Sequence, residues 1–236
     1  MHIRDDLISA HDRAWHRLAA PGTWWSGVER VAIATEARAA PACRLCRGRR
    51  DALAPGMVTG RHDCASELSE SVVDAVHRVR TDSARLTEAW ARGLLQAGMS
   101  DGHYVELIGI VATVTAVDSF RHALGLPERP LPEPLPGEPA RRRPAGAKPG
   151  LAWVPTVAPE DLTAEDPPMY QGKSGANIHR ALSLVPEEVI GFFDLDDAMY
   201  LPDALLRDFG HEHRALTHAQ IELLAARVSA LNQCTY

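Results

Sequence analysis

The distribution of proline is the feature of this sequence that most restricts its fold. Twelve of the 17 prolines lie between residues 127 and 168. Proline lacks a backbone N–H and its ring clashes with the preceding helical turn, so this stretch is excluded from continuous α-helix. We expect residues 127–170 to form an extended, semi-rigid connector. The connector separates a first unit, residues 1–126, from a further unit, residues 171–236.

Both units carry the apolar periodicity of helices. In the first unit the segments with this pattern are 3–19, 27–39, 69–79 and 104–124, with a further helix expected from Asp82 or Ser83 to about Ala97. A short helix beginning near Ala42 would carry two cysteines. In the second unit we expect helices over 177–184, from Pro186, and from a capping box at Thr217 to Asn232. The sequence therefore predicts an all-α helical bundle.

Length, charge and hydropathy narrow the class of protein. The chain has 236 residues and a net charge of −6, and nucleic-acid binders usually carry a basic excess instead. The apolar run 107–117 is shorter than the roughly 18–20 residues needed to span a bilayer. No apolar stretch of a signal peptide follows the N-terminus. We expect a soluble, cytoplasmic protein without a membrane or nucleic-acid partner.

The strongest local signal is the Cys-x-x-Cys pair of Cys43 and Cys46. In a reducing compartment this spacing is typical of metal-binding or redox-active cysteines. A thiol near a helix N-terminus, among four arginines, would ionise readily and could attack a peroxide. Because His62 and Cys64 follow, a structural zinc site with three cysteines and one histidine is an alternative. Inert thiols are the third possibility.

The end of the chain has a related pattern. Glu222 is followed by eleven residues and then Cys234, and a looser copy in the first unit contains Glu29, Glu36 and Cys43. Each copy has an Ala-Arg step before its cysteine. Two Ala-rich amphipathic helices can also resemble each other by chance, so the repeat remains an open hypothesis.

The segment 222–236 resembles the active-site helix of the alkylhydroperoxidase D and carboxymuconolactone decarboxylase-like superfamily. The motif of that family is a glutamate, eleven residues, Cys-x-x-Cys, three residues and a histidine. Glu222 and Cys234 match its first two elements, and segments 99–127 and 177–186 resemble neighbouring helices of the family. The resemblance covers most of the chain except the connector, and it implies an all-helical fold of two tandem units.

The resemblance also implies a function, the thiol-dependent reduction of hydroperoxides by a homo-oligomer, such as a trimer. Cys46 would attack the peroxide and Cys43 would resolve the sulfenic acid to a disulfide. A dithiol reductant protein would then reduce that disulfide, without a bound cofactor. Glu29 or Glu36 would relay protons. Glu222 and Cys234 would have the corresponding roles in the second unit.

The sequence departs from the family motif in both units. In the first unit the position of the family's histidine is occupied by Arg50. In the second unit the chain ends at Tyr236, before the second cysteine and the histidine. We interpret this end either as a truncation or as a UGA codon that encodes selenocysteine. A second, incomplete unit would leave an apolar helix face that needs burial or a partner.

Two other functions remain open at this point. A carboxymuconolactone decarboxylase-like lyase would not need the cysteine pair. A non-catalytic helical module with structural zinc at Cys43, Cys46, His62 and Cys64 belongs to a different class. His77 lies beside Arg78 and is expected to be exposed, so it enters neither hypothesis.

Overall fold

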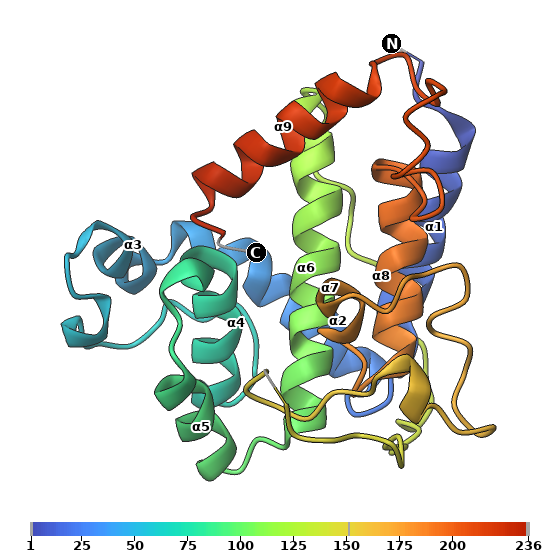
Figure 1. The fold of residues 1–236 in the computed structure, drawn as a ribbon. Coiled ribbons are helices and arrows are strands. Elements are labelled where there is room, and N and C mark those ends of the chain that lie inside the picture. Colours follow the sequence, from blue (N-terminus) through green and yellow to red (C-terminus); the bar gives the residue numbers. More distant parts are fainter. Residues whose placement is uncertain (1, 151, 235–236) are drawn as a thin grey trace.

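The computed structural model describes residues 2–150 and 152–234, and over these residues the chain is all-α (Figure 1). The described residues contain only one isolated β-bridge, between Lys148 and Thr156. The all-α prediction is confirmed. The α-helices are α1 (Asp5–Ala19), α2 (Gly27–Ala39), α3 (Arg44–Asp51), α4 (Glu70–Asp82), α5 (Glu88–Gln96), α6 (Asp101–Ala123), α7 (Asn177–Arg180), α8 (Pro186–Met199) and α9 (His218–Leu231).

Helix α6 forms the centre of the bundle, and α2, α4 and α8 pack around it (Figure 1). Leu107, Ile110 and Val114 of α6 are almost completely buried. By length and composition α6 could cross a membrane, and half of its most apolar window is buried inside the bundle. The core helix of a soluble protein can have the same length and apolar composition.

The helix starts follow from local side-chain chemistry. Ser26 and Glu29 form a capping box at α2, and the hydroxyl of Ser100 accepts a hydrogen bond from a backbone N–H at the start of α6. The predicted capping box at Thr217 is confirmed at α9. The predicted start at Asp82 or Ser83 is wrong, because Thr87 caps α5. Residues 83–85 instead form a 3₁₀ turn.

The proline-rich segment 127–170 contains no α-helix in its described residues. It is docked on the bundle by backbone hydrogen bonds, such as the 2.8 Å bond from Leu135 N to Ala19 O. The Trp15 indole N–H also donates to Pro130 O at 2.8 Å. Val157 is completely buried. The segment therefore supplies part of the core instead of crossing solvent.

The segment after the connector contributes to the same bundle through α8, which packs on α1 and α6. Asp194 of α8 pairs with Arg13 and Arg17 of α1. Helix α9, in contrast, is mostly exposed, and His218 is the only buried residue along its described length. Leu223 is 71% exposed. The predicted division into two tandem units stays a prediction.

Candidate metal-binding and redox site

Two cysteines and two histidines meet between α3, α4 and the loop that joins them. One ligand atom from each of Cys43, Cys46, His62 and His77 lies within 4.8 Å of the ligand atoms of the other three. The two cysteines are 1% and 3% exposed, and His77 is completely buried. We call these four residues the Cys2His2 cluster. Because so little of it is exposed, it is a closed site.

The start of α3 places the two sulfur atoms. Pro41 and Ala42 belong to a short 3₁₀ turn that ends α2, and Cys43 occupies the N-cap position of α3. Asp63 holds this start by accepting a 2.8 Å hydrogen bond from the backbone N–H of Arg44. The backbone N–H of Asp63 in turn donates to Cys43 Sγ at 3.4 Å. The Cys-x-x-Cys spacing therefore directs both sulfurs to one side of the helix start.

His77 is oriented by Glu36, a completely buried carboxylate of α2. The distance from His77 Nε2 to Glu36 Oε2 is 2.8 Å, and the other oxygen of Glu36 accepts from Ala65 N and Ser66 Oγ. A carboxylate partner keeps the proton of the imidazole on Nε2. His77 Nδ1, on the other side of the ring, lies 3.3 Å from Cys46 Sγ.

His62 has the same arrangement with a different carboxylate. Its Nε2 lies 3.0 Å from Asp74 Oδ1, and its Nδ1 lies 3.6 Å from Cys43 Sγ and 3.5 Å from Cys46 Sγ. Arg49 and Trp90 also donate to the Asp74 carboxylate. Each imidazole is thus fixed between a carboxylate on one side and sulfur on the other.

These contacts shift the pKa values of the cluster. Burial opposes ionisation of Cys46, but hydrogen bonds from His62 and His77 lower the pKa of its thiol to about 6. Burial also opposes the imidazolium form of His62, yet Asp74 and the two cysteines raise its pKa to about 10. Burial opposes ionisation of Cys43 too, but backbone hydrogen bonds from Cys46 and Asp63 lower its pKa. Burial likewise opposes the imidazolium form of His77, yet Cys46 and Glu36 raise its pKa. The site stabilises negative charge on sulfur, which both metal binding and thiol chemistry require.

Some of the residues predicted from the sequence lie outside the cluster. Cys64 is exposed, and its thiol donates only to the carbonyl of His62, at 3.5 Å. His77 occupies the fourth position that the zinc hypothesis gave to Cys64. Glu29 accepts hydrogen bonds from Ser26 in the capping box of α2. Of the two glutamates proposed as proton relays, Glu36 is the one that contacts the cluster.

The predicted residues of the second unit are on α9 and just after it. Glu222 accepts a hydrogen bond from the Tyr200 hydroxyl, and Cys234 is exposed. Within the described residues, no hydrogen bond or ion pair links either of them to the Cys2His2 cluster. Tyr236, where the chain ends, lies outside the described residues.

The expected exposure of His77 is wrong. The neighbouring residues Arg78 and Arg80 suggested a solvent-facing helix surface, but α4 is covered on the side that carries Val73, Val76 and His77. The helical spacing from Val73 to His77 was the available signal, because residues four apart share a face. A histidine on the apolar face of a helix, downstream of a Cys-x-x-Cys pair, is therefore as strong a candidate ligand as Cys64.

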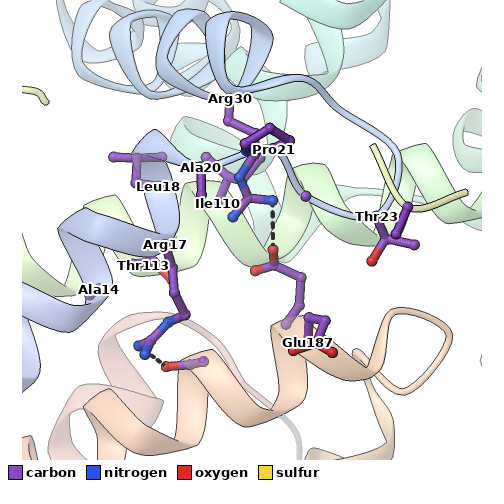
Figure 2. Close-up of a pocket in the computed structure, with 14 residues that line it drawn as sticks. Ala14, Arg17, Leu18, Ala20, Pro21, Thr23, Arg30, Ile110, Thr113 and Glu187 are labelled. Carbon is purple, nitrogen blue, oxygen red and sulfur yellow. Dashed lines mark hydrogen bonds and ion pairs between the residues drawn. The ribbon is translucent and has the colours of Figure 1, made fainter. Parts of the chain in front are cut away.

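A second polar cluster lies in the core. Arg30 of α2 donates through Nη1 to Glu106 of α6 and to Glu188 of α8, the latter at 2.8 Å. Arg30 and Glu188 border a cavity of about 270 Å³. Figure 2 shows Arg17 and Arg30 reaching across it toward α8. Gly109 allows this arrangement, because a Cβ there would collide with the Glu188 carboxylate. We call Arg30, Glu106 and Glu188 the buried charge triad.

The chain matches no known protein-family model, no curated protein and no solved structure. The resemblance to the alkylhydroperoxidase D-like superfamily therefore stays a prediction. The same holds for the predicted hydroperoxide substrate, dithiol reductant, homo-oligomer and cytoplasmic location. The Cys2His2 cluster is the feature of the structure that bears on function.

Proposed function

We propose that this chain is a zinc-binding helical protein and that the Cys2His2 cluster holds one Zn²⁺ as a closed structural centre. The observation that supports it is the spacing of the four ligand atoms. With Zn–S of about 2.3 Å and Zn–N of about 2.0–2.1 Å, tetrahedral geometry requires sulfur and nitrogen to be about 3.6 Å apart. Three of the four sulfur–nitrogen distances in the cluster are 3.3, 3.5 and 3.6 Å, and the fourth lies within 4.8 Å.

The surroundings of the cluster favour the same ion. Two thiolates and two imidazoles at tetrahedral positions are the donor set that zinc prefers. Both histidines donate their other ring N–H to a carboxylate, Glu36 or Asp74. This carboxylate–histidine–metal arrangement fixes the ring orientation and makes the imidazole a better ligand. All four positions come from the protein, which is typical of structural sites, whereas catalytic zinc sites keep one position open.

Zinc binding is tested on the full reduced chain. We expect one Zn²⁺ per chain by elemental analysis after gel filtration. Substitution with Co²⁺ should give the visible absorption bands of tetrahedral cobalt, together with a thiolate-to-cobalt charge-transfer band. A chain that binds substoichiometric zinc and gives an octahedral Co²⁺ spectrum would exclude the proposed centre.

Replacing Glu36 with glutamine should weaken zinc binding by about 10–100-fold, the usual effect of losing a carboxylate behind a ligating histidine. The amide keeps the size of the side chain but is a weaker acceptor for His77 Nε2–H. Competition with a chromophoric chelator measures the affinity. Glu29→Gln is the matched control, because Glu29 lies on the same helix and its carboxylate accepts hydrogen bonds from Ser26 in the helix cap. An equal effect of both variants would mean that Glu36 acts only through the fold.

Thiol-dependent reduction of hydroperoxides is the second candidate. The contact of Cys46 with two imidazoles and the hydrogen bond between His77 and Glu36 favour it, because together they would stabilise a thiolate and carry a proton. The zinc-free reduced chain would then consume hydrogen peroxide over many turnovers with a dithiol, and Cys46→Ser would not. Turnover that is fastest without metal would favour this candidate over a structural centre.

A further inference from the structure

We propose that the zinc centre is a redox switch: a hydroperoxide oxidises Cys43 and Cys46 to a disulfide, and the disulfide releases the zinc. This inference rests on the proposed zinc centre and adds its regulation. It differs from catalytic peroxide reduction because the reaction is stoichiometric and its product is a rearranged protein. The partner chemistry is a small hydroperoxide in one direction and a dithiol with Zn²⁺ in the other.

The chemical step balances as a two-electron oxidation. One thiolate attacks the distal oxygen of the hydroperoxide, the O–O bond breaks, and the alkoxide or hydroxide takes a proton. The resulting sulfenic acid is attacked by the second thiolate, an S–S bond forms, and hydroxide leaves as water after taking a second proton. The two sulfurs lose two electrons to the peroxide. Zn²⁺ is neither oxidised nor reduced and leaves as the free ion.

Because of the geometry of the cluster, we expect this oxidation to release the zinc ion. Both sulfur ligands come from one Cys-x-x-Cys pair, and their Sγ atoms lie within the 4.8 Å span of the cluster. A single disulfide between Cys43 and Cys46 therefore removes half of the donor set. The remaining ligands, His62 and His77, are two imidazoles without an anionic donor. Zinc binding requires deprotonated ligands, so the disulfide form should lose the ion.

The structure also indicates which part of the chain would lose order when zinc is released. We call residues 43–64 the cysteine segment; it includes α3, which lies at the edge of the molecule beside α4 (Figure 1). Its apolar contacts form a small satellite cluster of Cys43, Leu45, Cys46 and Val58, separate from the main core. Leu53 and Met57 of the segment are exposed. Few buried apolar contacts are the mark of a low-stability region.

The other contacts between the cysteine segment and the rest of the molecule include an ion pair and a hydrogen bond. Arg49 pairs with Asp74, and Arg85 donates to the carbonyl of Ala52 at 3.0 Å. Such contacts contribute modestly compared with a bound metal. We therefore expect the disulfide form to keep the main bundle and to loosen residues 43–64. In the reduced chain, local opening of this weakly packed segment would give a small peroxide access to sulfurs that are buried in the closed state.

The switch is tested by treating the zinc-loaded full chain with hydrogen peroxide. A chromophoric chelator reports released Zn²⁺, thiol titration reports oxidation, and peptide mapping identifies the disulfide. We expect one zinc released for every two thiols lost, with Cys43 and Cys46 linked, and recovery after a dithiol and Zn²⁺ are added. Hydrogen exchange should rise in peptides from residues 43–64. Cys64→Ser is the control, because it removes the exposed thiol of the same segment and should leave zinc release unchanged.

The outcomes separate this inference from the zinc centre itself. A reduced chain that never binds stoichiometric zinc contradicts the centre and therefore the switch. A chain that binds one zinc but keeps it while peroxide is consumed contradicts only the switch. Zinc release that stops in Cys64→Ser, or that occurs without a link between Cys43 and Cys46, also contradicts it.

Discussion

Replacing His77 with alanine is expected to weaken zinc binding by more than about 100-fold, because losing a ligand should cost more than losing its carboxylate partner. Cys64→Ser should bind zinc as the unsubstituted chain does, since the exposed Cys64 thiol is hydrogen-bonded to the carbonyl of His62 and lies outside the cluster. Chelator competition measures both. The opposite result, zinc retained in His77→Ala and lost in Cys64→Ser, would restore the ligand set of Cys43, Cys46, His62 and Cys64.

A companion variant is needed because His77 is completely buried and its loss leaves a cavity. Cys46→Ser changes one atom of the cluster and nearly preserves its volume, so a loss of zinc there reports ligation. In both variants we expect increased hydrogen exchange in α3, while α6 stays protected. The main core that contains Leu107 and Ile110 does not include the cysteine segment.

The sequence was sufficient for most of the helices. Proline at positions such as Pro41 and Pro186, and caps such as Thr217 and Ser100, place helix boundaries through local backbone chemistry. Helix α2 has the predicted bounds, residues 27–39. The start of α5 was misplaced because Asp82, Ser83 and Thr87 are all acceptable N-caps. Tertiary contacts decide among them, as Arg85 holds the carbonyls of Arg49 and Ala52.

The candidate site was predictable only in part. Cys43 and Cys46 are neighbours by their spacing, and the loop residue His62 follows closely enough to be included. Assigning His77 required the packing of α4 against α2, which brings Glu36 to its ring from 41 positions away in the sequence. No local pattern encodes that pairing. Spacing alone therefore indicated a cluster of cysteine and histidine side chains, but it included Cys64, which is exposed, instead of His77.

The buried charge triad illustrates the same dependence on tertiary structure. Glu106 lies on the apolar helix α6, where a buried acid needs a partner. The structure supplies Arg30, which also pairs with Glu188. Three helices contribute one residue each, so one guanidinium ties α2, α6 and α8 together. Burial raises the pKa of Glu106, and the neighbouring Glu188 raises it further while Arg30 opposes the shift. The arginine is therefore the group that lets two carboxylates be buried together.

Replacing Arg30 with methionine is expected to destabilise the chain by about 3–5 kcal/mol, the usual cost of leaving buried charges without their partner. The Arg30 side chain is only 6% exposed, so solvent cannot substitute for it. The free energy of unfolding from urea titration measures the effect. Arg92→Gln is the matched control, because the Arg92–Glu88 pair is exposed and should contribute about 0.3–0.5 kcal/mol.

Two further measurements separate charge from packing in the buried charge triad. Combining Arg30→Met with Glu106→Gln and Glu188→Gln should recover much of the lost stability, because no uncompensated carboxylate remains. The single variant should also be less destabilised at low pH. Burial holds the pKa of Glu106 above its usual range, and removing Arg30 takes away the charge that opposes this shift. Stability is then present at low pH and is lost as pH rises through the folded-state pKa of Glu106. A loss that is independent of pH and equal in the single and triple variants would mean that Arg30 stabilises the bundle by filling volume.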